Sequence, residues 1–130
     1  LVEAYLRQRH ERWWVRLQER LAVAPEPRVL AVFDSYRDDA DGALHGCAFL
    51  NAAAELRGDH PGLTVIREHK QAVREKVQRL IAAERGKEAA QRLAEHVFLL
   101  LEGAIAQRGV DPDGRSLEIA QGLARELLAA

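Results

Sequence analysis

The segment 46–56 constrains the fold of this chain more than any other, because it is almost entirely apolar, with the amide Asn51 in its middle. It shows no alternation of period two, and Ala52, Ala53 and Ala54 favour helix over strand. A helix that is apolar on every side has to be buried on every side. We therefore expect a central helix over 46–56, closing at Gly58, which other helices surround.

The remainder of the chain also has helical periodicity. Apolar residues recur at spacings of three and four, which predicts further helices over 1–24, 26–40, 59–85 and 87–107 and a last one opening at Asp111 and Pro112. Pro25 and Pro27 end the first helix, and Gly86 is a typical residue after a helix end. We expect one all-α domain over residues 1–130, a helical bundle of about six helices.

Composition excludes several classes of protein. Nineteen basic and twenty acidic residues give a net charge of −1, so the chain lacks the electrostatic footprint of a nucleic-acid-binding domain. No apolar run reaches the length of a membrane span. A single cysteine excludes an internal disulfide framework and favours a cytoplasmic location. The chain contains no Met and begins inside a helical pattern, so we expect that residues preceding it are missing.

The last two predicted helices have apolar stripes that are wider than one neighbouring helix can cover, and both carry small residues. Such helices can pair with the same two helices of a second copy, forming an isologous four-helix interface. The simpler alternative is that both stripes close the core of the monomer. We expect a homodimer, with an interface formed by Leu93, Val97, Leu100, Ala104, Leu117, Ala120, Ala124 and Leu127.

The order of these elements and several local strings resemble the C-terminal regulatory domain of TetR-family bacterial transcriptional regulators. The matching strings are Leu-Val-Glu-Ala-Tyr at 1–5, Gly-Cys-Ala-Phe-Leu-Asn-Ala-Ala-Ala-Glu-Leu at 46–56, His-Pro at 60–61 and Leu-Leu-Leu-Glu-Gly-Ala-Ile at 99–105. The resemblance covers essentially the whole chain. It implies that an N-terminal DNA-binding head with a helix-turn-helix is absent from these residues.

The resemblance also implies a function. A small-molecule effector would bind among the first five helices and change the spacing of the two DNA-reading heads of the dimer; repressor and activator are both compatible with this. Ligand pockets are mostly apolar with a few placed polar groups. The inward-facing aromatic and polar candidates are Trp13, Phe33, Tyr36, Phe49, Asn51 and His69. Trp14 competes with Trp13 for the inward position.

No catalytic set emerges from the sequence, and we expect neither an enzyme nor a bound cofactor. Ser35 and Ser116 have no obvious partners for a triad. No histidine pair has the i, i+4 spacing of a compact metal motif, so no metal site is expected. The alternative function is a small helical protein that depends on a metal or a thiol and uses Cys47, His45 and His69. Asp38, Asp39 and Asp41 are expected in a solvated turn.

Overall fold

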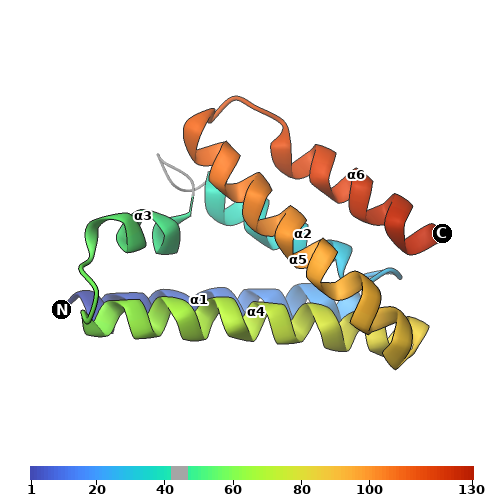
Figure 1. Ribbon diagram of the computed structural model, residues 1–130, viewed down its shortest axis with the longest axis horizontal. Coiled ribbons are helices and arrows are strands. Elements are labelled where there is room, and N and C mark those ends of the chain that lie inside the picture. The colour runs from blue at the N-terminus through green and yellow to red at the C-terminus, as the bar shows by residue number, and fades with distance from the viewer. Residues whose placement is uncertain (42–46) are drawn as a thin grey trace.

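The structure is a computed structural model that describes residues 1–41 and 47–130 (Figure 1). Within these residues the chain is all-helical and has no strand, which confirms the predicted fold class. The six helices are α1 (Val2–Val23), α2 (Leu30–Asp41), α3 (Ala48–Glu55), α4 (Pro61–Arg85), α5 (Lys87–Val110) and α6 (Ser116–Ala129).

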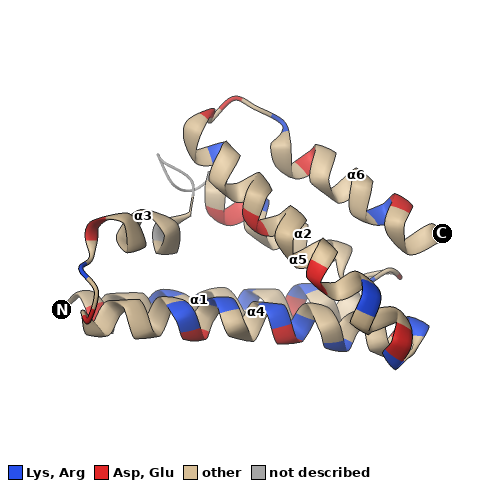
Figure 2. Cartoon of the chain, in the orientation of Figure 1, with Lys and Arg blue, Asp and Glu red and all other residues tan. Residues whose placement is uncertain are grey.

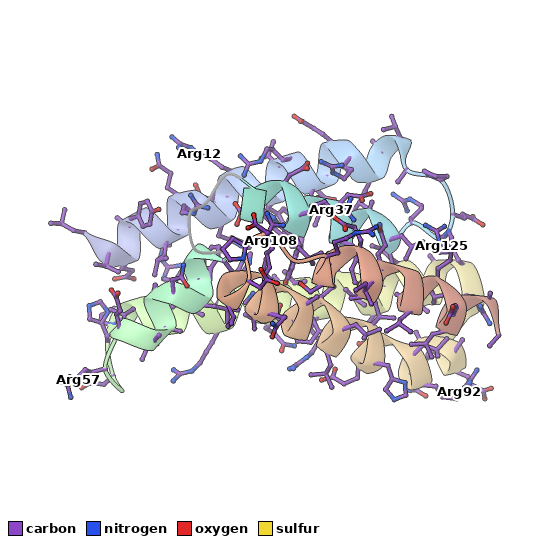
Figure 3. The ribbon with its side chains drawn as sticks, turned by 90° about the horizontal axis from the view of Figure 1, so that it is seen from above. Arg12, Arg37, Arg57, Arg92, Arg108 and Arg125 are labelled. Carbon is purple, nitrogen blue, oxygen red and sulfur yellow. The ribbon has the colours of Figure 1, made fainter. Side chains whose placement is uncertain are left out.

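The helices of the bundle form two layers. α1 and α4 run side by side in one layer, and α2, α5 and α6 lie over them (Figure 1). Seen from above, α1, α2, α6 and α5 follow one another across the molecule (Figure 3). The short α3 packs on α4 near the first turns of α1 and α4. In the view of Figure 2, basic and acidic residues are mixed along α1 and α4.

The periodicity of α1 and α4 correctly predicts their buried faces. On α1 the side chains of Leu6, Trp13, Leu17 and Leu21 are buried, and the helix ends before Pro25. α4 begins at Pro61 as expected: the Nδ1 atom of His60 accepts a hydrogen bond from the Gly62 N–H at 2.9 Å. α4 closes at Gly86, whose φ of 91° suits glycine.

Two helix starts differ from the prediction. α2 begins at Leu30 and not near residue 26, because the two prolines leave a turn in which the Leu30 N–H bonds to the Pro27 carbonyl at 3.1 Å. α6 begins at Ser116 and not at Asp111. Residues 111–114, Asp-Pro-Asp-Gly, form a turn instead, with the Gly114 N–H bonded to the Asp111 carbonyl at 3.0 Å.

The expectation that the apolar segment 46–56 forms a fully surrounded central helix is wrong. α3 has only eight residues, and Phe49, 2% exposed, is its one large side chain that is buried completely. Asn51, Ala54 and Glu55 are exposed to solvent. Alanine carries too little apolar surface to require burial, so the helix is stable with one face packed, mainly on α4.

The residues expected at a dimer interface mostly face the monomer's own core. Six of the eight are buried within the single chain, namely Leu93, Val97, Ala104, Leu117, Ala120 and Ala124, and only Leu100 and Leu127 are partly exposed. The expected contact surface is therefore corrected. α5 packs on α4, α6 and α2, and α6 packs on α5 and α2. A different face of both helices is exposed, with Leu99 on α5 and Leu123 on α6.

No helix among the described ranges combines the length and the apolar character needed to cross a membrane.

Candidate functional site

An aromatic cluster forms where α1, α2, α3 and α4 meet. At its centre is His69 of α4, only 3% exposed. Phe49 of α3 stacks on its ring, with the centroids 3.9 Å apart and the planes within 7°. Trp13 of α1 meets His69 at 5.2 Å and Tyr36 of α2 at 5.8 Å, both edge to face. Four helices thus contribute one ring each to this cluster.

A second histidine bonds to the centre of the cluster. The Nδ1 atoms of His10 and His69 lie 2.7 Å apart, so one must carry a proton and the other accept it. Burial, the positive charge of Lys70 and that of His10 lower the pKa of His69 to about 2. Burial also lowers the pKa of His10, against the opposite effect of nearby glutamates. Both rings are therefore neutral at pH 7.

A charged network lies beside the rings. Lys70 of α4 and Glu102 of α5 form an ion pair at 3.0 Å. The Tyr36 hydroxyl donates to the Glu102 carboxylate at 2.7 Å, and the Lys70 ammonium lies 3.8 Å from the Cys47 sulfur. Burial and the negative charge of Glu102 hold the pKa of Tyr36 well above its usual value, so its hydroxyl stays protonated and remains a donor.

The space enclosed by the cluster is almost filled. A cavity of about 10 Å³ remains, lined by Trp13, Tyr36, Asp39, Cys47, Phe49, His69, Lys70 and Ile105. This volume holds at most about one water molecule. A ligand larger than water therefore has to displace side chains to enter.

The structure brings together four of the six predicted ligand-binding residues: Trp13, Tyr36, Phe49 and His69. Phe33 is fully buried but does not line this cavity, and Asn51 faces solvent on the outer side of α3. The choice between the tryptophans is also settled. Trp13 points inward, and Trp14 is half-buried beside the His10 ring at 5.6 Å.

Sequence analysis missed Lys70 and Glu102, because charged residues on long helices usually face solvent. One signal was present for Glu102. It is a lone carboxylate inside an otherwise apolar run from Val97 to Ile105. Asp38 and Asp39 were placed in a solvated turn, whereas they lie in the last turns of α2 and pair with arginines of α1. Asp41 has no described side chain.

The metal or thiol alternative remains a prediction. No group of three or more His, Cys, Asp or Glu side chains that could hold a metal occurs in the part of the chain that the structure describes. Cys47 and His69 line the same small cavity, but His45 lies outside the described residues.

A second feature is an apolar face on the outside of α5 and α6. Leu99 of α5 is 57% exposed, and Leu123 of α6 is 46% exposed. Between them lies an open groove of about 520 Å³, lined by His96, Leu99, Leu100, Leu123, Glu126, Leu127 and Ala130. Contiguous exposed apolar surface of this kind marks interaction sites. We call these seven residues the outer α5/α6 face.

Comparisons of the chain with protein-family models, with curated proteins and with solved structures find no match.

The neutral histidine at the centre of the cluster predicts a pH-dependent stability. In the folded state the pKa of His69 is about 2, whereas in the unfolded state it is near 6.5. As the pH falls below 6.5, the unfolded state therefore binds a proton that the folded state does not bind. The contribution of neutral His69 to the free energy of unfolding is complete above about pH 6.5 and is lost as the pH falls below that value. Between about pH 7 and pH 5, His69 should remove about 2 kcal/mol from the free energy of unfolding.

Urea unfolding of the wild type and of His69→Gln at the two pH values measures this contribution. Glutamine can keep a hydrogen bond to His10 but does not titrate, so the variant should lose less stability on acidification. An equal loss in both proteins would contradict the neutral, buried state of His69.

Proposed function

We propose that this chain is the effector-sensing and dimerisation domain of a TetR-like bacterial transcriptional regulator. Small-molecule binding at the aromatic cluster would control DNA binding by a helix-turn-helix head N-terminal to these residues. This proposal rests on the sequence resemblance and on one structural arrangement, the position of α5 between the two features described above.

α5 supports the proposal because it contributes residues both to the aromatic cluster's surroundings and to the outer α5/α6 face. On one side Glu102 bonds to Tyr36 and Lys70, and Ile105 lines the cavity of the cluster. On another side, within a turn, Leu99 and Gly103 are exposed, the first of them on the outer α5/α6 face. A displacement of Glu102 is therefore transmitted by a single rigid helix to a surface suited for a partner.

The closed cavity defines how an effector would act. The cavity of about 10 Å³ has no room for an effector. An effector must therefore bind a conformation in which the rings are displaced, and it cannot bind the conformation described here. The free energy for opening comes from its differential affinity for the two arrangements, typically about 1–3 kcal/mol. Such a ligand would move Trp13 of α1 and Tyr36 of α2, which line the cavity, and Tyr36 is bonded to Glu102 of α5.

The partner that we propose for the outer α5/α6 face is a second copy of the chain. The face combines the apolar residues Leu99 and Leu123 with the polar residues His96 and Glu126, as protein interfaces combine apolar and polar groups. Gly103 and Gly122 are exposed, and a methyl group added at either would meet nothing within 4 Å, so the backbones of these helices are accessible to close packing. Two such faces related by a two-fold axis form a four-helix interface.

Charge placed on this face should abolish the dimer. At micromolar concentration, sedimentation velocity should find the wild type as a dimer and Leu99→Glu and Leu123→Glu as monomers, because a buried unpaired carboxylate is costly. The matched control is Val15→Glu on α1, since Val15 has the same 57% exposure as Leu99 and lies outside the face. A monomeric wild type, or dimeric Leu99→Glu, would rule out this interface.

Effector binding should be visible through Trp13. Trp14→Phe leaves Trp13 as the sole tryptophan of the chain, and its indole contacts both His69 and Tyr36. In a thermal-shift screen of small molecules, compounds that act at the cluster should raise Tm and also change Trp13 emission. If the stabilising compounds leave Trp13 emission unaltered, the effector site has been placed wrongly.

A further inference from the structure

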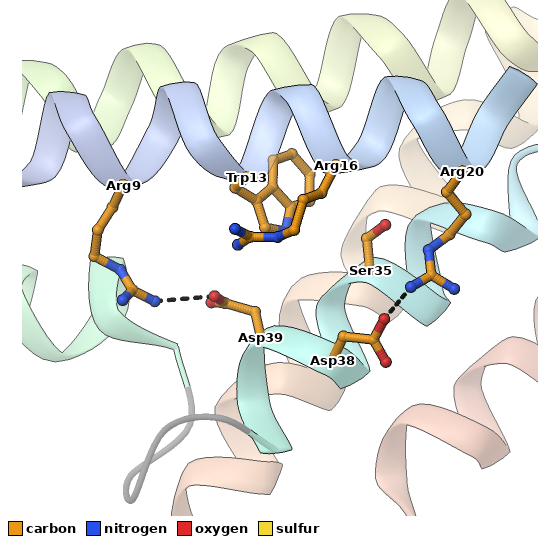
Figure 4. A pocket seen from close by; sticks show the side chains of 7 residues that line it. All are labelled: Arg9, Trp13, Arg16, Arg20, Ser35, Asp38 and Asp39. Atoms are coloured by element: carbon orange, nitrogen blue, oxygen red, sulfur yellow. Dashed lines mark hydrogen bonds and ion pairs between the residues drawn. The ribbon is translucent and has the colours of Figure 1, made fainter.

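A second pocket lies between α1 and α2, and it shares Trp13 and Asp39 with the small cavity of the aromatic cluster. Its volume is about 250 Å³. α1 supplies Arg9, Trp13, Arg16 and Arg20, which share one face of the helix, and α2 supplies Ser35, Asp38 and Asp39 (Figure 4). We call this space the α1/α2 pocket.

The charges of the α1/α2 pocket are unevenly paired. Arg9 binds Asp39 at 2.9 Å, and Arg20 binds Asp38. Arg16 lies between these two pairs in the view of Figure 4, and it lines the pocket together with Trp13. Within residues 1–41 and 47–130 it has no ion pair or hydrogen bond. Three guanidinium groups and two carboxylates leave the pocket with one net positive charge, which Arg16 carries.

Ser35 adds an independent sign that a ligand belongs here. Its side chain points from α2 toward α1 and lines the pocket, and the residue is only 6% exposed. Its hydroxyl oxygen is buried and has no hydrogen-bond partner in the part of the chain described. Buried polar groups are nearly always satisfied, and one left alone is costly. An acceptor bound in the α1/α2 pocket would satisfy this hydroxyl.

We propose that the α1/α2 pocket binds a small carboxylate monoanion with a flat apolar body. The carboxylate accepts hydrogen bonds from the Arg16 guanidinium, which suits planar carboxylates, and from the Ser35 hydroxyl. The apolar part packs on Trp13. A monoanion matches the single net positive charge, whereas a dianion such as phosphate brings a second negative charge close to Asp38 and Asp39. Three guanidinium groups exclude a cation.

This inference goes beyond the proposed regulatory function and does not depend on it, because binding requires only α1 and α2. Trp13 nevertheless belongs to both sites, since its indole lines the α1/α2 pocket and also contacts His69. A monomeric protein that binds the anion would contradict the proposed dimer and leave this inference intact.

Isothermal titration calorimetry with benzoate as the probe tests the site, with benzamide as its neutral counterpart and inorganic phosphate as the dianion. We expect benzoate to bind, and benzamide to bind at least about tenfold more weakly, because a hydrogen bond to a charged group contributes that much or more. Phosphate should also bind more weakly than benzoate, because it has no apolar part to pack on Trp13 and brings more negative charge close to Asp38 and Asp39. Arg16→Gln should weaken benzoate binding by about tenfold or more.

Two further variants separate ligand contact from folding. Ser35→Ala should weaken benzoate binding several-fold while Tm stays equal or rises, because it removes an unsatisfied buried hydroxyl. Arg12→Gln is the matched control, because Arg12 lies on α1, points away from the bundle (Figure 3) and does not line the pocket. The affinity of this variant for benzoate should equal that of the wild type. The inference is overturned if benzoate does not bind at millimolar concentration, if benzamide or phosphate binds as well, or if Arg16→Gln binds like Arg12→Gln.

Discussion

Lys70 and Glu102 face each other between α4 and α5 with only 15% and 19% of their side chains exposed. A buried ion pair stabilises a fold weakly by comparison with apolar packing, but breaking it leaves an uncompensated charge and is strongly destabilising. The Tyr36 hydroxyl donates a hydrogen bond to the same carboxylate. One shared carboxylate therefore links α2, α4 and α5, and the rings of Trp13 and His69 pack beside Tyr36 and Lys70.

In the proposed function, this network transmits the effect of a bound ligand to other parts of the domain. Two of its three helices also contribute to another feature: α2 carries Ser35 of the α1/α2 pocket, and α5 carries Leu99 of the outer α5/α6 face. A ligand that displaces the rings has to disturb Tyr36 or its carboxylate partner, because these groups line or border a cavity without spare volume. The proposed regulation therefore depends on two properties of the site: its cavity is almost filled, and the Glu102 carboxylate beside it is costly to leave unpaired.

The sequence predicted those parts of the fold that follow from periodicity. The stripes of α1 and α4 placed Trp13 and His69 inside, and His60 and Gly86 marked the ends of α4 correctly. The face of α3 was not predictable, because alanine fits buried and exposed positions equally well, and Asn51 turned outward. α5 and α6 have two apolar faces each, and periodicity does not say which is internal. The pairing of Glu102 with Lys70 is a spatial relation across 32 residues, for which a single sequence carries no pattern.

We infer that Lys70 and Glu102 act as one energetic unit. A double-mutant cycle of Lys70→Met and Glu102→Gln, with free energies of unfolding from urea titrations, measures this coupling directly. We predict that the double variant is more stable than the sum of the two single effects by at least about 1 kcal/mol, since each single variant leaves its partner buried and unpaired. Additivity within about 0.3–0.5 kcal/mol would contradict the account.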